Sequence, residues 1–257
     1  MFDIIIVSYN NLQFLQLTID SINKNSVFLN NIIVHVNEGT DGTIEWLDQQ
    51  NIQYTHTSYN AGLSVAANIA SSKAFNRFIC LIDDDMYLCP DWDSNLYEFR
   101  IQNNLNDSAW VCSTVIEREG GCSGSVQGSF GGRDTFLEQQ LLNVYKFYNV
   151  VPRVSTQVTP LTIGLDTWKT IGGYDQAFFV IGSEEGLAKR LYDRGTRNFV
   201  NAPDSLAYHF ATTTTNKLMY RTIHSEARDK IFKHQHNMTI KEFNKLIGRG
   251  NPWKNHS

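Results

Sequence analysis

The sequence predicts an α/β protein with a mostly parallel, doubly wound sheet, helices on both faces and a mainly helical C-terminal tail. Two observations predict it. Short apolar, β-branched runs alternate with amphipathic segments of helical period over the first ~90 residues. Polar or glycine-containing turns follow these runs, and ligands collect beyond the carboxyl ends of strands in such sheets. A length of 257 residues suits one principal domain.

The expected elements alternate regularly through the N-terminal part. The first run is apolar and β-branched, as a central parallel strand is, and a polar stretch ends it. Leu12, Leu15, Ile19 and Ile22 then recur at helical spacing. In order, we expect a strand at 3–7, a helix at 12–22, a strand at 32–36, a short helix around 44–47, a strand at 53–57, a helix at 63–74 and a strand at 78–82.

Composition and charge exclude several classes of protein. The chain is 42% hydrophobic and 19% charged, which is ordinary for a folded globular protein. A net charge of -4 gives no reason to expect a nucleic-acid partner. The four cysteines show no Cys-x-x-Cys pair or dense framework, so we expect a cytoplasmic protein. No apolar stretch approaches the roughly 20 residues that span a bilayer, which leaves peripheral docking to a membrane surface open.

The densest group of carboxylates follows the fourth expected strand, where Asp83, Asp84 and Asp85 come directly after an apolar run. Three adjacent carboxylates repel one another unless a positive charge lies among them, and hard divalent cations prefer oxygen ligands. We therefore expect Asp83 and Asp85 to share one ion with substrate phosphates. A solvated acidic turn is the alternative, because aspartate also favours loops.

Other ways of handling phosphate lack their motifs. The chain contains neither the Gly-x-x-x-x-Gly-Lys-Ser/Thr loop of kinases and ATPases nor the Gly-x-Gly-x-x-Gly turn of dinucleotide enzymes. Two rival functions stay open: a nucleotidyltransferase on a similar sheet, and a non-catalytic protein that binds sugars or nucleotide sugars.

The succession of motifs resembles the family 2 type of inverting glycosyltransferases, which share the nucleotide-diphospho-sugar fold called GT-A. The motifs are IIIVSYN near the N-terminus, NEGTDGT at 37–43, NAGLSVAANIA at 60–70, CLIDDDMYLCPDW at 80–92 and IGGYDQAFFVIGSEEGLAKRL at 171–191. The resemblance implies a GT-A domain at 1–210, with a nucleotide-binding half at 1–92 and an acceptor-binding half at 93–210. It leaves 211–257 as a C-terminal helical extension.

The resemblance also implies the reaction. A sugar would pass from a nucleotide-diphosphate sugar to a hydroxyl of a saccharide or glycoconjugate acceptor, with inversion and with help from Mn²⁺ or Mg²⁺. It assigns the metal to Asp85 and Asp83, with His209 as a third ligand, since imidazole suits Mn²⁺ better than Mg²⁺. A histidine buried in the core is the alternative for His209. The implied donor-binding residues are Ser8, Tyr9, Asn10, Glu38, Asp41, Asn60, Gly62, Asn68, Asp83 and Asp84.

The catalytic base is expected from Glu184 or Glu185, which match the family's acidic motif at the start of a helix. The Arg190-Leu191 pair stands in the register that favours Glu184. This carboxylate would take the proton from the acceptor hydroxyl. Alternatively, both glutamates only complement a helix N-terminus.

The acceptor side is expected to include Asp175 and Trp168. Asp175 stands in a Gly-Gly-Tyr-Asp stretch that resembles a family segment, and it would shape the acceptor site. Trp168 would offer a face for sugar stacking. Burial in the core is the alternative for this tryptophan, because large aromatic side chains dominate buried surface.

Overall fold

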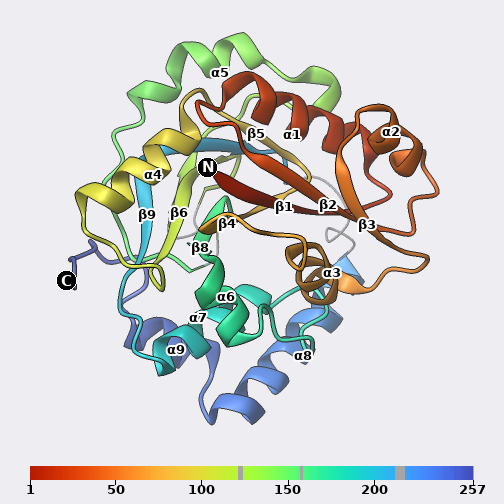
Figure 1. Cartoon of the computed structure of the whole chain (residues 1–257). Helices are drawn as coiled ribbons and strands as arrows, with labels where there is room; N and C mark the ends of the chain where they lie inside the picture. Colours follow the sequence, from red (N-terminus) through yellow and green to blue (C-terminus); the bar gives the residue numbers. More distant parts are fainter. Residues whose placement is uncertain (121–123, 157–158, 212–217, 257) are drawn as a thin grey trace.

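The computed structural model describes residues 1–120, 124–156, 159–211 and 218–256. Within them, one nine-stranded sheet crosses the molecule in the order β3-β2-β1-β4-β8-β6-β9-β5, with β7 beside β6 (Figure 1). The strands are β1 (Phe2–Tyr9), β2 (Asn31–Asn37), β3 (Gln53–Thr57), β4 (Phe78–Asp83), β5 (Met86–Leu88), β6 (Trp110–Glu117), β7 (Ser125–Gln127), β8 (Leu161–Gly164) and β9 (Phe199–His209).

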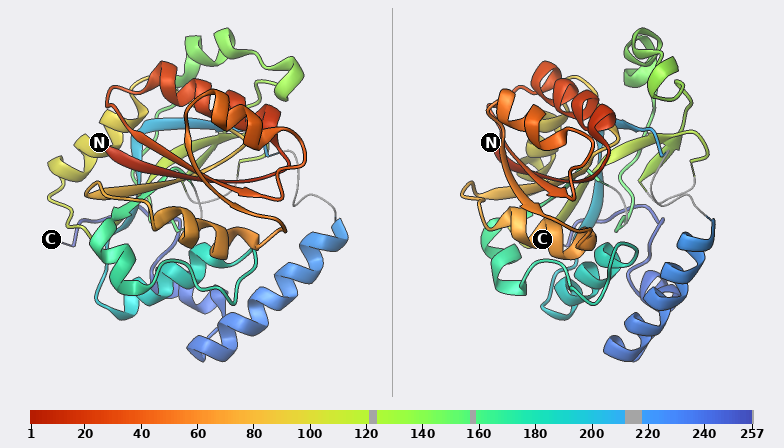
Figure 2. Two further views of the ribbon diagram at one scale, coloured as in Figure 1. Left: turned by 45° about the vertical axis from the view of Figure 1, so that its right-hand side comes forward. Right: turned by 90° about the vertical axis from the view of Figure 1, so that its right-hand side faces the viewer.

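The helices are α1 (Leu12–Asn25), α2 (Thr43–Gln49), α3 (Gly62–Ser71), α4 (Trp92–Gln102), α5 (Glu138–Val144), α6 (Leu165–Ile171), α7 (Ser183–Asp193), α8 (Leu218–His236) and α9 (Ile240–Leu246). Helices α1 and α4 lie on one face of the sheet, and α3, α6 and α7 lie on the other (Figures 1 and 2). The prediction of helices on both faces is confirmed.

The first four strands form the parallel part of the sheet. Strand β1 lies between β2 and β4 and is parallel to both. Ile4, Ile5 and Ile6 are at most 1% exposed, so successive side chains pack against both helical layers. The predicted strands and helices of this part are present, with shifts of a few residues at some ends. Their carboxyl ends bring the predicted donor-binding loops to one edge of the sheet.

The second half changes strand direction, which the sequence did not reveal. Strand β8 runs antiparallel to β4 and β6, β6 and β9 are parallel, and β5 is antiparallel to β9. The β6–β9 pairing changes register partway: Ser113 pairs with Ala202, but Thr114 pairs with Leu206. Three extra residues on β9 therefore form an irregularity, and such features commonly redirect side chains near active sites.

The predicted C-terminal extension packs onto the main domain. Phe232 of α8 and Phe243 of α9 are fully buried, belong to the principal core, and have ring centroids 6.0 Å apart. The chain then runs back beside the sheet, where Pro252 bridges to Arg153. Residues 212–217, at the start of this extension, lie outside the described residues.

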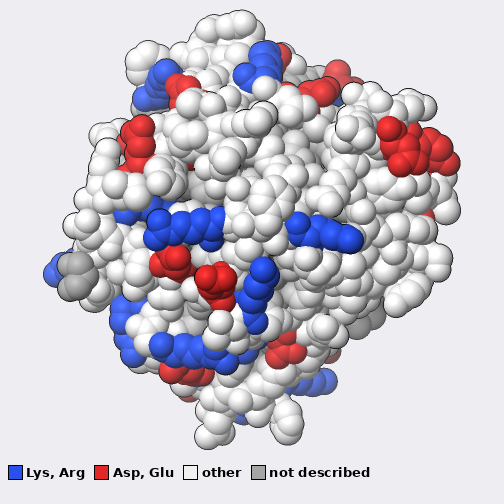
Figure 3. Space-filling view, in the orientation of Figure 1, with Lys and Arg blue, Asp and Glu red and all other residues white. Residues whose placement is uncertain are grey.

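Figure 3 shows basic and acidic side chains interspersed over the face seen in Figure 1. Among the described residues, no helix is both long and apolar enough to cross a membrane.

Candidate active site

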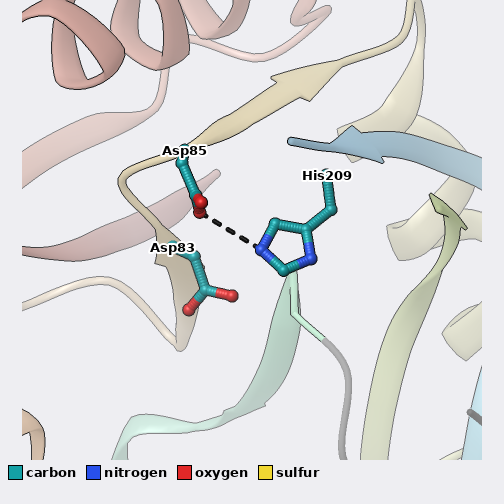
Figure 4. Close-up of side chains that lie close together, drawn as sticks. All are labelled: Asp83, Asp85 and His209. Atoms are coloured by element: carbon teal, nitrogen blue, oxygen red, sulfur yellow. Dashed lines mark ion pairs between the residues drawn. The ribbon is translucent and has the colours of Figure 1, made fainter. Parts of the chain in front are cut away.

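Two aspartates and a histidine meet where β4 turns into β5. One ligand atom from each of Asp83, Asp85 and His209 lies within 4.8 Å of the other two (Figure 4). The Nε2 atom of His209 is 3.2 Å from Oδ1 of Asp85. Carboxylate oxygens and an imidazole nitrogen form a donor set that suits Mn²⁺ and related ions, so this group could bind a metal.

The sheet places His209 opposite the aspartates. His209 pairs with Met86 across the antiparallel β5–β9 ladder, and the amide of Phe210 donates to the carbonyl of Asp85 at 3.0 Å. Tyr208 and Phe210 instead join an aromatic cluster with Phe136, whose ring stacks on Tyr208 at a centroid distance of 5.7 Å. Because neighbouring side chains of a strand point to opposite faces, burying these two aromatics directs His209 toward the acidic turn.

The electrostatics of this group indicate a need for positive charge. Burial raises the pKa of Asp83, and the neighbouring Asp85 adds to the rise. Burial by itself would lower the pKa of His209, but Asp85 and Glu117 raise it well above its ordinary value. The hydroxyl of Thr159 donates to Oδ2 of Asp83 at 2.7 Å and so fixes the orientation of that carboxylate.

Asp84 lies apart from the other two aspartates. Its carbonyl accepts a hydrogen bond from Thr18 of α1, and it is not among the three clustered ligand groups. Burial and then Asp85 raise its pKa to about 8, while Ser8 and Asn11 oppose the rise. Ser8 is 1% exposed and lies beside this carboxyl. Ser8 is thus buried below the site and Asp84 is half-buried, and their predicted contacts with the donor remain predictions.

The two glutamates of α7 have different surroundings. Glu184 lines the same small pocket as Asp83, together with Thr159 and Tyr174. Burial, then the charges of Glu185 and Asp83, raise its pKa to about 8. A carboxylate whose pKa is raised in this way can accept a proton near neutral pH, as a general base must.

Glu185 points elsewhere. Its side chain is 4% exposed, and its Oε1 lies 3.9 Å from Nη1 of Arg228 in α8. Arg228 also packs at the glycine that begins α7: a Cβ on Gly182 would lie 2.5 Å from the Arg228 side chain. Glu185 therefore connects α7 to α8, whereas Glu184 lines the pocket.

The loops after β1 and β2 interlock on the donor side of the sheet. The side chains of Tyr9 and Asn10 both donate to the carboxylate of Glu38, at 3.3 Å and 3.1 Å. Both oxygens of Asp41 are engaged within the fold, by the amide of Leu12 and by Thr43. The geometry therefore favours a folding role for Asp41 over the predicted contact with the nucleotide.

The predicted donor residues in α3 and just before it also have hydrogen-bond or packing partners inside the protein. Asn68 exchanges two hydrogen bonds with the backbone of Tyr174, each 2.8 Å long, so its amide joins α3 to the turn before α7. Asn60 accepts from the amide of Gly62 at 3.0 Å. Gly62 has φ +79°, and a Cβ there would lie 2.4 Å from the carbonyl oxygen of Phe179. The missing side chain therefore lets the backbone of Phe179 approach the start of α3 closely.

The expectation that Trp168 offers a stacking face is wrong. Trp168 is 3% exposed, and its indole nitrogen donates to Ser71 at 2.8 Å. It packs edge-to-face on Tyr174 in the core, so neither ring face is open to a sugar.

Asp175 lies in the segment between α6 and α7 and is half-buried. Its carboxylate accepts hydrogen bonds from the amide of Ala177 and from the side chain of Gln235, so Asp175 lies where this segment contacts α8.

Sequence reasoning missed three side chains of this site: Thr159, Glu117 and Arg228. Thr159 and Glu117 lie far in the chain from the acidic turn, and neither belongs to a recognisable motif. Only the pairing of β4 with β8 and of β6 with β9 brings their segments to the turn. Arg228 stands on the C-terminal helix, which periodicity could place as a helix but not against a particular partner.

The sequence profile of glycosyl transferase family 2 matches residues 3–153. The chain belongs to this family. The match includes Asp83 and Asp85 and ends before Glu184 and His209, which come from the second half of the sheet and its helices.

A crystal structure described as GalNAc-T7 with UDP, GalNAc and Mn²⁺ is similar to this chain, with a TM-score of 0.61 and 14% sequence identity. The likeness covers 97% of this chain and 54% of the other, so this chain spans about half the length of that protein. At this identity the likeness concerns the fold, and it confirms the GT-A fold. No curated protein matches the chain in sequence.

Proposed function

We propose that this chain transfers a sugar from a nucleotide-diphosphate sugar to a hydroxyl of a saccharide or glycoconjugate acceptor, with inversion at the anomeric carbon. One observation carries the proposal. Glu184 and Asp83 line the same pocket, although they come from α7 and β4, which lie far apart in the chain. A donor held at the aspartates would therefore present its sugar to Glu184.

Asp83, Asp85 and His209 would hold the divalent cation. A bound ion supplies positive charge that stabilises a departing diphosphate. Two carboxylates and one imidazole leave coordination positions for phosphate oxygens, since Mg²⁺ and Mn²⁺ favour six ligands. The similar crystal structure that contains UDP and Mn²⁺ supports this choice of ligand classes.

Tyr9, Asn10 and Glu38 would bind the nucleoside. They join the loops at the carboxyl ends of β1 and β2, where doubly wound sheets bind ligands. Glu38 has φ +61° and Asn10 has φ +48°, so both take a left-handed conformation that residues with side chains seldom adopt. Such conformations are over-represented at binding sites.

Glu184 would act as the general base. In an inverting transfer, the acceptor oxygen attacks the anomeric carbon while a carboxylate removes its proton. Glu185 is a poorer candidate, because its carboxylate lies against Arg228 and outside the pocket. We also propose that Asp175 and its contact with α8 shape the acceptor side.

A donor screen tests the proposal. Purified protein is incubated with nucleotide sugars and Mn²⁺, and binding is detected as a rise in the unfolding temperature, because a ligand that binds the native state stabilises it. Product formed with the donor that binds is then examined by NMR for its anomeric configuration. Retention of configuration would exclude the single displacement.

The non-catalytic alternative has a separate test. If the chain only binds a nucleotide sugar, Glu184→Gln leaves its function intact. If it is a transferase, the variant binds donor normally and forms little product.

A further inference from the structure

We propose that Glu117 is a positioning residue that orients His209 for metal binding. The proposal rests on the metal site proposed above. The second nitrogen of the His209 ring lies on the side of the ring away from Asp85 (Figure 4). This Nδ1 atom is 3.6 Å from Oε1 of Glu117, while Nε2 is 3.2 Å from Asp85.

The imidazole of His209 thus lies between two carboxylates that face its two nitrogens. A histidine that binds a metal through one nitrogen commonly donates the other N–H to a carboxylate, which fixes both the tautomer and the direction of the ring. At 3.6 Å the Glu117 contact is an ion-pair distance, and a small rotation of either side chain converts it to a hydrogen bond. With Nδ1–H directed at Glu117, the Nε2 lone pair points toward Asp83 and Asp85.

The sheet builds this arrangement. Ile116 pairs with Tyr208 across the parallel β6–β9 ladder, so Glu117 and His209 are the next residues along the two strands. The three extra residues on β9 set this register. If Pro203, Asp204 and Ser205 instead continued the regular pairing, Glu117 would lie beside Leu206, and His209, three residues further on, would point to the opposite face. The irregularity therefore brings carboxylate and imidazole together.

The backbone of Glu117 is anchored from its other side. Strand β7 pairs with it through Gln127, and the amide of Gly128 donates to the Glu117 carbonyl at 2.8 Å. Its side chain is 21% exposed. Within the described part of the chain, no lysine or arginine lies within ion-pair distance of this carboxylate. Among the described residues, the imidazole of His209 is therefore the basic group that the Glu117 carboxylate contacts.

Mn²⁺ binding to the whole protein tests the proposal, with free Mn²⁺ measured by electron paramagnetic resonance. We expect Glu117→Ala to weaken Mn²⁺ binding by about 10- to 100-fold, the usual effect of losing the partner of a metal-binding histidine. Glu117→Gln should retain more affinity, because its amide oxygen still accepts the Nδ1–H bond. Glu119→Ala, an exposed carboxylate two residues away, is the matched control and should bind as wild type does.

A second readout does not depend on affinity. In protein loaded with Zn²⁺, a diamagnetic ion that imidazole binds well, long-range ¹H–¹⁵N spectra distinguish the two histidine tautomers, and His209→Ala identifies the signal. We expect the Nδ1–H form in wild type and in Glu117→Gln, and a mixture of forms in Glu117→Ala. Thermal unfolding of each variant without metal verifies folding.

Different failures have different meanings. If wild-type protein binds no Mn²⁺, the proposed metal site itself is wrong. If wild type binds and Glu117→Ala binds equally well with an unchanged tautomer, the metal site stands and the role of Glu117 is wrong. Equal and complete loss in Glu117→Ala, Glu117→Gln and Asp85→Ala would make Glu117 a direct ligand and overturn the positioning role.

Discussion

Replacing each glutamate of α7 separately should divide catalysis from stability. Glu184→Gln keeps the shape of the side chain and removes its ability to accept a proton. General base catalysis contributes about 10²- to 10⁴-fold, so kcat should fall by that factor, equivalent to about 3 to 5 kcal/mol of activation free energy. Donor binding should be unchanged, because Asp83, Asp85 and His209, which we propose to hold the cation at the donor diphosphate, are intact in this variant.

Glu185→Gln should act mainly on stability. Removing one partner of a fully buried ion pair costs about 3–5 kcal/mol, and an exposed pair about 0–1 kcal/mol. The pair with Arg228 is intermediate: its atoms are 3.9 Å apart, and the arginine side chain is 24% exposed. We expect a loss of about 1–2 kcal/mol, which lowers the unfolding temperature by roughly 2–8 °C.

The assays are product formation at saturating donor and differential scanning calorimetry on both variants. The pH profile adds a check. Because the base must be deprotonated and the pKa of Glu184 is about 8, kcat/KM should rise with pH toward that value. A bound cation offsets the charge of Asp83 and moves the midpoint lower. An active Glu184→Gln together with an inactive, fully stable Glu185→Gln would refute the assignment.

Three further outcomes are expected. Gly62→Ala should destabilise the protein by about 2–4 kcal/mol in urea unfolding, since it adds a left-handed strain and a clash with Phe179; Gly172→Ala, with φ +81° and open space, should cost only about 1–2 kcal/mol, and equal losses would contradict the clash. Thr159→Val should weaken Mn²⁺ binding by about tenfold in the resonance assay, because Asp83 loses a charge-assisted hydrogen bond; unchanged affinity would remove Thr159 from the site. Without metal, stability should decrease as pH rises from about 4 to about 8, because the pKa of Asp84 is raised to about 8 in the folded state and the folded protein binds the extra proton. Calorimetry across this range should show a flatter profile for Asp84→Asn, and an identical slope would exclude Asp84 as the source.

The N-terminal half could be predicted because its signals are local. Strand β1 is a continuous apolar run, and α1 repeats apolar residues at helical spacing. A parallel α/β unit buries each strand on both faces, so its strands can be recognised in the sequence as continuous apolar runs. For the same reason the acidic triplet could be located at a strand end, where the structure has it.

The way in which His209 and Glu117 reach the acidic turn could be seen only in the tertiary structure. Sequence alternation indicated Asp83 and Asp85, and their grouping with His209 agrees with it. What no local pattern shows is that β9 carries three extra residues against β6, which turn His209 toward the acidic turn and Glu117 toward His209. Strand register depends on partners far away in the chain.

The same distinction explains the error at Trp168. Its indole could stack on a sugar in principle, but a side chain's availability depends on what packs over it. Trp168 is buried and packs on Tyr174, whose backbone also bonds both groups of the Asn68 amide. The sequence by itself determined the parallel part of the sheet, its carboxyl edge and the residue types gathered there. Only the tertiary structure decided which of those side chains face the pocket. Contacts between segments far apart in the chain occupy the hydrogen-bonding groups of some side chains and leave those of others directed at the site.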